Sequence, residues 1–123
     1  MTRHEVKETL GGYYRACRDL QDIKTRIDKA KNDTESLVND VLEELTEELH
    51  KAVYKADKQL ARVQNYINLL NDGDGNATVL KMYHIEGLSD KEIAKKMYLS
   101  AEYIRTKRWR AYQKIADILG ESA

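Results

Sequence analysis

The 123-residue chain carries 21 basic and 21 acidic side chains, so its formal net charge of zero does not by itself indicate a nucleic-acid partner. Its single cysteine excludes an intramolecular disulfide and a cysteine-based zinc site, and it fits a reducing, cytoplasmic compartment. No apolar run approaches the roughly 20 residues that cross a membrane. Residues 1–20 also lack the apolar core of a signal peptide, so we expect no membrane partner.

The composition favours an all-α fold. The chain has no proline and is rich in lysine, glutamate, leucine and alanine, which are strong helix formers. Hydrophobic residues make up 41% of the sequence and charged residues 34%, which provides apolar surface for a small core. We therefore predict either a single helical domain or one small helical domain with a helical extension.

Residues 3 to about 31 are predicted to form the first long helix, because apolar side chains recur there at steps of three and four residues. The positions are Leu10, Tyr13 or Tyr14, Cys17, Leu20, Ile23 or Lys24, Ile27 and Ala30. The pair Gly11-Gly12 weakens the helix by roughly 1 kcal/mol per glycine. We therefore expect a frayed N-terminal turn before this pair and a regular helix from Tyr13 onward, with Cys17 as a small buried hydrophobe.

A second helix is predicted from Glu35 for about 37 residues, or about 55 Å, after a cap at Asp33 or Thr34. Its apolar stripe is Leu37 or Val38, Val41, Leu45, Leu49, Ala52 or Val53, Ala56, Leu60, Val63, Ile67 and Leu70. Two series in this stripe, 49-56-63-70 and 53-60-67, keep the seven-residue period of a coiled coil. A helix of this length cannot bury its stripe on itself. The rest of the stripe must meet the C-terminal domain or a second chain. We predict a coiled-coil-like helical hairpin over residues 1–71, with a homodimer as the expected cover of the remaining apolar surface.

Charge is distributed unevenly along the chain. Residues 1–31 carry a net charge of +3, residues 32–76 of −6 and residues 77–123 of +3. The acidic run at 33–48 is typical of a solvated helix face near a helix N-terminus. The alternatives are a contact surface for a basic partner such as RNA polymerase, electrostatic repulsion that steers this segment away from DNA, and pairing with the basic first helix. The basic charge gathers at 100–115, as phosphate neutralisation requires.

Residues 72–76 are predicted to form a linker. The segment 71–76 reads NDGDGN and begins like a calcium-binding loop. Ala77 and Tyr83, however, stand where such a loop needs a glycine and a bidentate glutamate. We therefore expect no metal at this segment and a flexible connection between two domains.

A short helix is predicted to follow the linker. Asn76 or Thr78 is expected to cap its start, since both side chains are good N-caps. The helix is expected to end near Ile85, with Gly87 closing it. His84 near its end is expected at the surface or at the edge of the core.

Two helices joined by a tight turn are predicted next. Ser89 and Glu92 have the spacing of a capping box at the start of the first helix. Leu99 is expected to be buried in the turn, and Ser100 is expected to cap the second helix at 101–119. A short helix, a turn and a longer basic helix make a helix-turn-helix, whose second helix enters the DNA major groove.

Residues 77–119 resemble the C-terminal −35-reading domain of bacterial sigma factors (sigma-70 region 4) and the related sigma-like regulators. The matching residues are Val79-Leu80, Tyr83, Gly87-Leu88-Ser89, Glu92-Ile93-Ala94, Leu99-Ser100, Ile104 and Arg110-Ala111. The chain departs from the family at Arg108, where leucine is usual, and at Trp109, where histidine or arginine is common. With its long helical N-terminal half, the whole chain is similar to small phage or prophage transcriptional regulators. The resemblance implies a helix-turn-helix DNA-binding domain at 77–123.

The expected DNA face lies on the first turns of the second helix of this motif. The residues expected to read bases are Glu102, Tyr103, Arg105, Thr106 and Trp109. The first four correspond to base-reading positions in the family, and Arg105 is the best candidate for bidentate guanine recognition, worth roughly 1–3 kcal/mol of discrimination. The residues expected to contact the DNA backbone are Lys91, Lys95, Lys96, Ser100, Lys107, Arg108, Arg110 and Lys114. The alternative for the lysines is a role in solubility, and the alternative for Tyr103 is packing on the turn.

No catalytic or metal-binding arrangement can be identified. His4, His50 and His84 do not lie three or four residues apart, as helical metal ligands do. The sequence also has no identifiable nucleophile–base pair, catalytic carboxylate pair or phosphate-binding glycine loop. We therefore expect a protein that is not an enzyme and that has no cofactor or metal. Four tyrosines are expected at the edge of the core or of an interface: Tyr13, Tyr14, Tyr54 and Tyr66.

The predicted function is that of a sequence-specific DNA-binding transcription regulator of phage or prophage type. Its expected partners are double-stranded DNA, a second copy of the chain bound through the helical hairpin, and RNA polymerase. Two alternatives stay open. A small subunit of a phage DNA-packaging terminase also combines a helix-turn-helix with oligomerisation helices. An interaction module with a sigma-like fold would bind RNA polymerase without reading DNA.

Overall fold

The computed structural model describes residues 1–32 and 38–121, and all regular structure in these residues is helical. This confirms the prediction of an all-α fold. The elements are α1 (Arg3–Leu10), α2 (Gly12–Lys31), α3 (Val38–Ile67), the 3₁₀ helix η1 (Asp72–Asp74), α4 (Asn76–His84), α5 (Asp90–Met97) and α6 (Ala101–Glu121). Within the described residues, no helix combines the length and the apolar character needed to cross a membrane.

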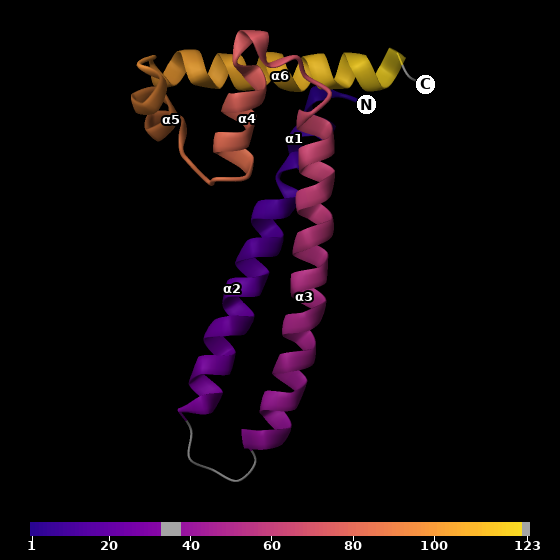
Figure 1. Ribbon diagram of the computed structural model, residues 1–123, viewed down its shortest axis with the longest axis vertical. Coiled ribbons are helices and arrows are strands. Elements are labelled where there is room, and N and C mark those ends of the chain that lie inside the picture. The colour runs from indigo at the N-terminus through magenta and orange to yellow at the C-terminus, as the bar shows by residue number, and fades with distance from the viewer. Residues whose placement is uncertain (33–37, 122–123) are drawn as a thin grey trace.

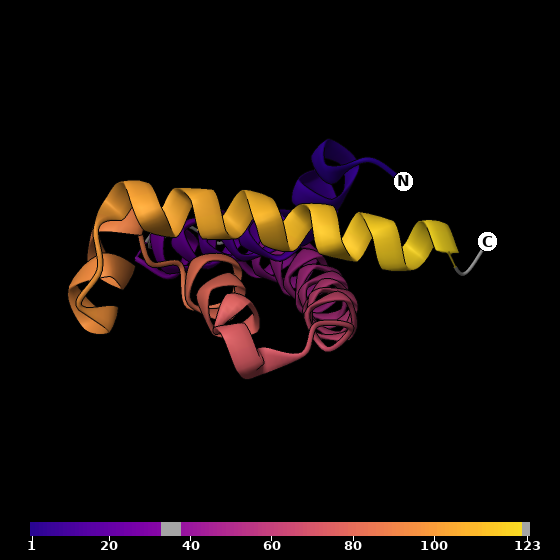
Figure 2. The same ribbon diagram turned by 90° about the horizontal axis from the view of Figure 1, so that it is seen from above.

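The two longest N-terminal helices, α2 and α3, lie side by side and form the long axis of the molecule (Figure 1). Helix α6 crosses one end of this pair. Viewed from above, α1 and α4 lie on opposite sides of α6 (Figure 2), and both pack against it. The predicted caps of the second helix, Asp33 and Thr34, lie outside the described residues.

The first helical segment is part of the core, and the prediction of a frayed N-terminal turn is wrong. Thr2 Oγ1 accepts a hydrogen bond from the Glu5 backbone nitrogen at 3.2 Å, and the Glu5 side chain reaches back to the Thr2 nitrogen, so a capping box opens α1. Val6 and Leu10 have no exposed surface. Gly11 separates α1 from α2 as predicted. Helix α1 is stabilised by the burial of Val6 and Leu10, which the helix propensity of its own residues does not predict.

One core joins the N-terminal and C-terminal halves of the chain. Its buried members come from α1, α3, α4 and α6: Val6, Leu10, Val63, Ile67, Ala77, Leu80, Ala111, Tyr112, Ile115 and Ala116. Tyr13 and Tyr66 pack against this core, whereas Tyr14 and Tyr54 are exposed. The N-terminal hairpin and the C-terminal helices therefore share a core, whereas the predicted division into two domains implied separate cores.

The segment between α3 and α4 is tied to α6, in contrast to the flexible linker expected at 72–76. The backbone carbonyl of Asp74 accepts a hydrogen bond from Lys107 Nζ, and its carboxylate forms an ion pair with Lys114. The hydrogen bond from Lys114 lowers the pKa of Asp74. Asp74 Oδ1 also accepts from the Asn76 backbone nitrogen at 3.1 Å. Helix α4 begins after Gly75, which has φ +76°, and neither Asn76 nor Thr78 is its N-cap.

The apolar stripe of α3 is covered mostly by the chain itself. Val63 and Ile67 are fully buried in the shared core, and Leu45 and Ala56 are buried against α2. Among the stripe residues whose side chains the structure describes, the two exposed ones are Val41, at 46%, and Val53, at 39%. At about 100° per residue they lie about 120° apart, on opposite edges of the stripe. They do not form one continuous seam, and the homodimer stays a prediction.

Candidate nucleic-acid interface

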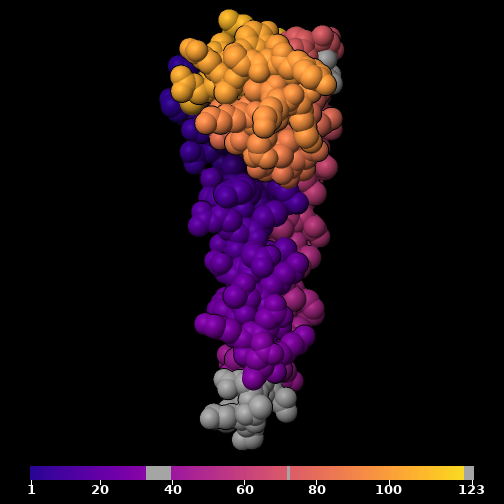
Figure 3. All heavy atoms as spheres, turned by 90° about the vertical axis from the view of Figure 1, so that its left-hand side faces the viewer, coloured from indigo at the N-terminus to yellow at the C-terminus, as the bar shows by residue number. Residues whose placement is uncertain are grey.

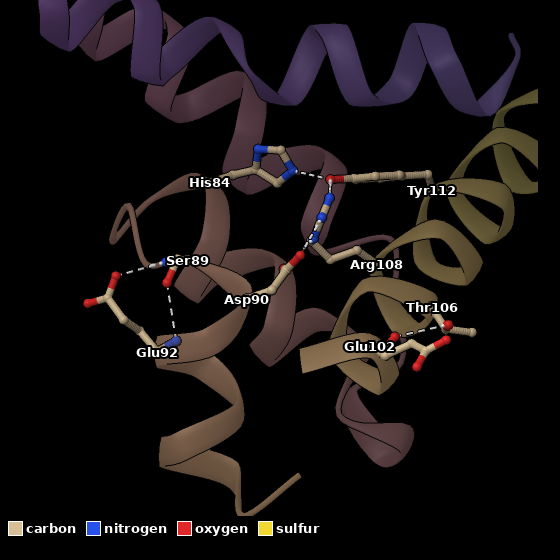
Figure 4. A network of polar contacts seen from close by, with 8 residues as sticks. All are labelled: His84, Ser89, Asp90, Glu92, Glu102, Thr106, Arg108 and Tyr112. Atoms are coloured by element: carbon tan, nitrogen blue, oxygen red, sulfur yellow. Dashed lines mark hydrogen bonds and ion pairs between the residues drawn. The ribbon is translucent and has the colours of Figure 1, made fainter. Parts of the chain in front are cut away.

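The start of α5 is fixed by the capping box that its sequence predicts. Ser89 Oγ accepts a hydrogen bond from the Glu92 backbone nitrogen at 3.2 Å, and Glu92 Oε1 accepts from the Ser89 backbone nitrogen at 3.1 Å (Figure 4). Hydrogen bonds to the Glu92 carboxylate, first from the Ser89 backbone nitrogen and then from the Ser89 hydroxyl, lower the pKa of Glu92. The cap sets the direction in which α5 leaves the loop after α4.

Ser89→Ala is expected to lower the free energy of unfolding by about 1 kcal/mol, because it removes the side-chain acceptor from the first turn of α5. Urea denaturation followed by circular dichroism measures the change. Thr25→Ala is a suitable control, since Thr25 is exposed in the middle of α2 and its hydroxyl bonds only to the carbonyl of Gln21 within the same helix. The same loss in both variants would mean that the cap contributes nothing specific.

The turn between α5 and α6 is tight and exposed. Tyr98 adopts φ +56°, a left-handed conformation, and its side chain is 94% exposed. Leu99 is 40% exposed, so the prediction of a buried leucine in the turn is wrong. A small core beneath the turn is already filled by Val79, Ile93, Ala94 and Ile104. Ser100 Oγ accepts from the Tyr103 backbone nitrogen at 3.1 Å, which confirms the predicted second N-cap.

A buried ion pair fixes α5 against α6. The guanidinium of Arg108 donates from Nε to Asp90 Oδ1 at 2.9 Å and from Nη2 to Asp90 Oδ2 at 2.8 Å (Figure 4). Its carbon Cζ lies 4.0 Å from the centre of the Tyr83 ring. Arg108 is only 5% exposed. The prediction that Arg108 contacts a DNA backbone is therefore wrong, because its charge is already matched inside the protein.

The ion pair continues into a buried hydrogen-bond chain. Arg108 Nη1 donates to the Tyr112 hydroxyl at 3.2 Å, and the Tyr112 hydroxyl lies 2.6 Å from His84 Nε2. Because Tyr112 accepts from the guanidinium, we assign its own proton to the bond with His84, which is then neutral. Burial first, and then the charges of Arg108 and Lys7, lower the pKa of His84 to about 4. Burial raises the pKa of Tyr112 to about 12.

His84 is therefore a buried member of this network, and its predicted place at the surface or core edge is wrong. No buried side-chain nitrogen or oxygen atom lacks a hydrogen-bond partner in the part of the chain that the structure describes. The network connects α4, α5 and α6, and each of its buried polar side-chain atoms has a hydrogen-bond partner. The orientation of α6 relative to α5 is thus set by buried polar contacts as well as by apolar packing.

The first two turns of α6 present a row of exposed polar side chains. Glu102, Tyr103, Arg105 and Thr106 are all exposed, and the structure brings them together on the side of α6 away from Ile104 and Ala111. The Thr106 hydroxyl donates to the Glu102 carbonyl at 3.1 Å, within the helix (Figure 4). These side chains are held on a helix whose opposite face is locked to α5.

Trp109 does not belong to this exposed row, in contrast to its predicted role. Its ring packs against the shared core and meets the Tyr112 ring edge-on, with centroids 5.4 Å apart. The His4 ring lies 5.4 Å from it, Arg3 Cζ 5.2 Å and Lys7 Nζ 5.3 Å. Helix α1 thus covers the indole.

The remaining basic residues divide into two groups. Those that are exposed and form no ion pair among the described residues are Lys91, Lys95, Lys96 and Arg110. Ser100 is exposed just before the start of α6. Lys107 is half-buried and donates to Asn76 Oδ1 at 3.1 Å, while Lys114 pairs with Asp74. Lys107 and Lys114 therefore already hold the segment between α3 and α4.

The basic side chains of α1 are the part of this surface that the sequence interpretation missed. Thr2 and Glu5 have the same spacing as Ser89 and Glu92, and this capping-box pattern was the available signal. It predicts an ordered helix start but does not predict its packing against α6. No group of three or more histidine, cysteine, aspartate or glutamate side chains that could hold a metal occurs among the described residues.

Comparison of the chain with protein-family models, with curated proteins and with solved structures gave no match.

Proposed function

We propose that the protein is a sequence-specific double-stranded-DNA-binding transcription regulator of phage or prophage type. In this proposal α5, the turn at 98–100 and α6 form a helix-turn-helix of the sigma-region-4 kind, and α6 enters the major groove. The main observation that supports this proposal is that α6 has two different faces. One face is fixed to α5 by the Arg108–Asp90 pair and apolar packing, and the other presents exposed polar side chains in its first two turns.

Arg105 is the residue that we expect to contribute most to sequence preference. It is exposed, and no acidic side chain pairs with it in the described residues. A guanidinium matches the two acceptors that guanine shows in the major groove, which is about 12 Å wide and admits an α-helix. Glu102, Tyr103 and Thr106 lie beside it and supply further contacts to base edges.

The distribution of charge supports DNA binding at the α6 end of the molecule. The exposed acidic side chains Asp40, Glu43, Glu44 and Glu47 lie at the start of α3. This end of the α2–α3 pair is far from α6 (Figure 1). The acidic residues are therefore kept away from a phosphate backbone bound at α6. We assign any contact with a basic surface of RNA polymerase to this acidic end.

Arg105→Ala is expected to relax the preference for one base pair of the bound site, with a loss of discrimination of about 1–3 kcal/mol. The measurement is selection of bound duplexes from a random DNA pool at near-physiological salt, followed by sequencing, with wild type and variant in parallel. Arg18→Ala on the exposed face of α2 removes the same charge and is expected to select the wild-type motif.

The outcomes of this selection separate the candidate functions. A defined motif supports the regulator, and two inverted half-sites in that motif would add a dimer. If Arg105→Ala selects the same motif as the wild type, Arg105 does not read a base of the site. Failure of the folded wild type to enrich any sequence would contradict the proposal and favour DNA packaging or a polymerase-bound interaction role.

A further inference from the structure

We propose that α1 is a second DNA-contacting element, in which Arg3 and Lys7 bind phosphates of the DNA backbone beside α6. The inference rests on the proposed function of α5 and α6, and it extends the contact surface to the other end of the chain. Arg3 and Lys7 are four residues apart, so they lie on one face of α1. That face is turned toward Trp109 of α6.

Trp109 is the platform that positions the two cations. Arg3 Cζ lies 5.2 Å and Lys7 Nζ 5.3 Å from the centre of its ring, both within range of a cation–π interaction. The indole is itself held by the edge-on Tyr112 ring, whose side chain is fully buried. The cations therefore lie next to the exposed row of α6, since Trp109 is one helical turn after Arg105.

A depression between α1 and α6 joins these cations to the candidate reading surface. It has a volume of about 490 Å³ and is lined by Lys7, Tyr83, Arg105, Thr106, Arg108 and Trp109. Lys7, Arg105 and Arg108 bring three positive charges to its wall, and no acidic side chain lines it. Asp90 neutralises Arg108, so Lys7 and Arg105 leave an excess of positive charge for an anion.

The position of α1 favours phosphate over base contact. Helix α1 lies alongside α6 on the side opposite α4 (Figure 2), and its residues border the surface made by α5 and α6 (Figure 3). A helix in the major groove has a sugar-phosphate strand on each flank, so an element beside that helix meets the backbone rather than base edges. Burial of Val6 and Leu10 holds α1 in this position before any DNA is bound.

The test measures binding of a labelled duplex that carries the selected motif and of a scrambled duplex, over a series of salt concentrations. Arg3→Ala and Lys7→Ala are each expected to weaken binding to both duplexes by roughly 5- to 10-fold at 0.1 M salt. Each is expected to lower the slope of log K against log salt by about 0.9, which corresponds to one phosphate contact. The preference for the selected motif is expected to stay as in the wild type.

Two controls keep the interpretation specific. Lys29→Ala, on the exposed face of α2 near its far end, removes the same charge and is expected to keep the wild-type slope. Trp109→Leu keeps an apolar side chain over the core but removes the aromatic ring that positions Arg3 and Lys7. It is expected to weaken binding to both duplexes, although the net charge of the protein does not change. Thermal unfolding of every variant checks that α1 stays folded.

The results distinguish this inference from the proposed function. Wild-type affinity and slope in both Arg3→Ala and Lys7→Ala, with a loss of preference in Arg105→Ala, would overturn the role of α1 and leave the regulator intact. A loss restricted to the selected motif would overturn the assignment of Arg3 and Lys7 to phosphates. If the folded wild type binds neither duplex, both proposals fail.

Discussion

Arg108→Ala is expected to lower the free energy of unfolding by about 3–5 kcal/mol, because it leaves the partly buried Asp90 carboxylate without its partner. It also removes the donor to the Tyr112 hydroxyl and the cation over the Tyr83 ring. Burial by itself lowers the pKa of Arg108, but the hydrogen bonds to Asp90 and Tyr112 outweigh it and raise the pKa, so the guanidinium is charged throughout. Urea denaturation gives the free energy.

The ion pair can be separated from general effects of losing an arginine. Arg110→Ala removes an exposed arginine two residues away on the same helix, and its expected effect is within about 0.5 kcal/mol. The double variant Arg108→Leu/Asp90→Asn removes both charges and is expected to recover part of the loss, since no uncompensated charge is left. If Arg108→Ala were as stable as Arg110→Ala, the pair would not hold α5 against α6.

Acidification is expected to destabilise the protein through His84. The pKa of His84 is lowered by burial, and then by Arg108 and Lys7, to about 4, against an ordinary value of 6.5. Between these two pH values the unfolded chain binds a proton at His84 that the folded chain does not, so stability falls as the pH falls. The full contribution is present above pH 6.5, and the loss approaches about 3 kcal/mol near pH 4.

Denaturation at a series of pH values from 4 to 8 measures this dependence. His84→Gln keeps a hydrogen-bonding side chain that does not titrate, and it is expected to flatten the profile in this range. His50→Gln is the matched control, because His50 is exposed on α3 and lies outside the network. Parallel profiles for wild type and His84→Gln would show that His84 binds its proton equally in both states.

Local signals in the sequence predicted the starts of α5 and α6 correctly. The capping box at Ser89 and the cap at Ser100 both involve residues three apart, and short-range hydrogen bonds of this kind follow from spacing alone. The all-α class followed from helix-forming composition and the absence of proline. The exposed residues Glu102, Arg105 and Thr106 followed from helical periodicity, because the apolar positions of α6 define the opposite face.

Long-range partners could not be predicted in the same way. Arg108 pairs with Asp90, 18 residues earlier, and an arginine at this position is usually read as exposed. His84 bonds to Tyr112, 28 residues later, and its burial depends on how α4 meets α6. Trp109 was assigned to the DNA face because nothing in the pattern of α6 indicates that α1 covers it. Each of these errors reflects tertiary contacts that periodicity does not contain.

The packing of α1 against α6 also has a consequence for biosynthesis. Val6 and Leu10 leave the ribosome about 100 residues before Ala111, Tyr112 and Ile115, with which they share a core. Helices α2 and α3 pair over a short connection and can associate early. The nascent chain therefore exposes the apolar face of α1 until α6 has been synthesised, and the core closes only after both helices have been made.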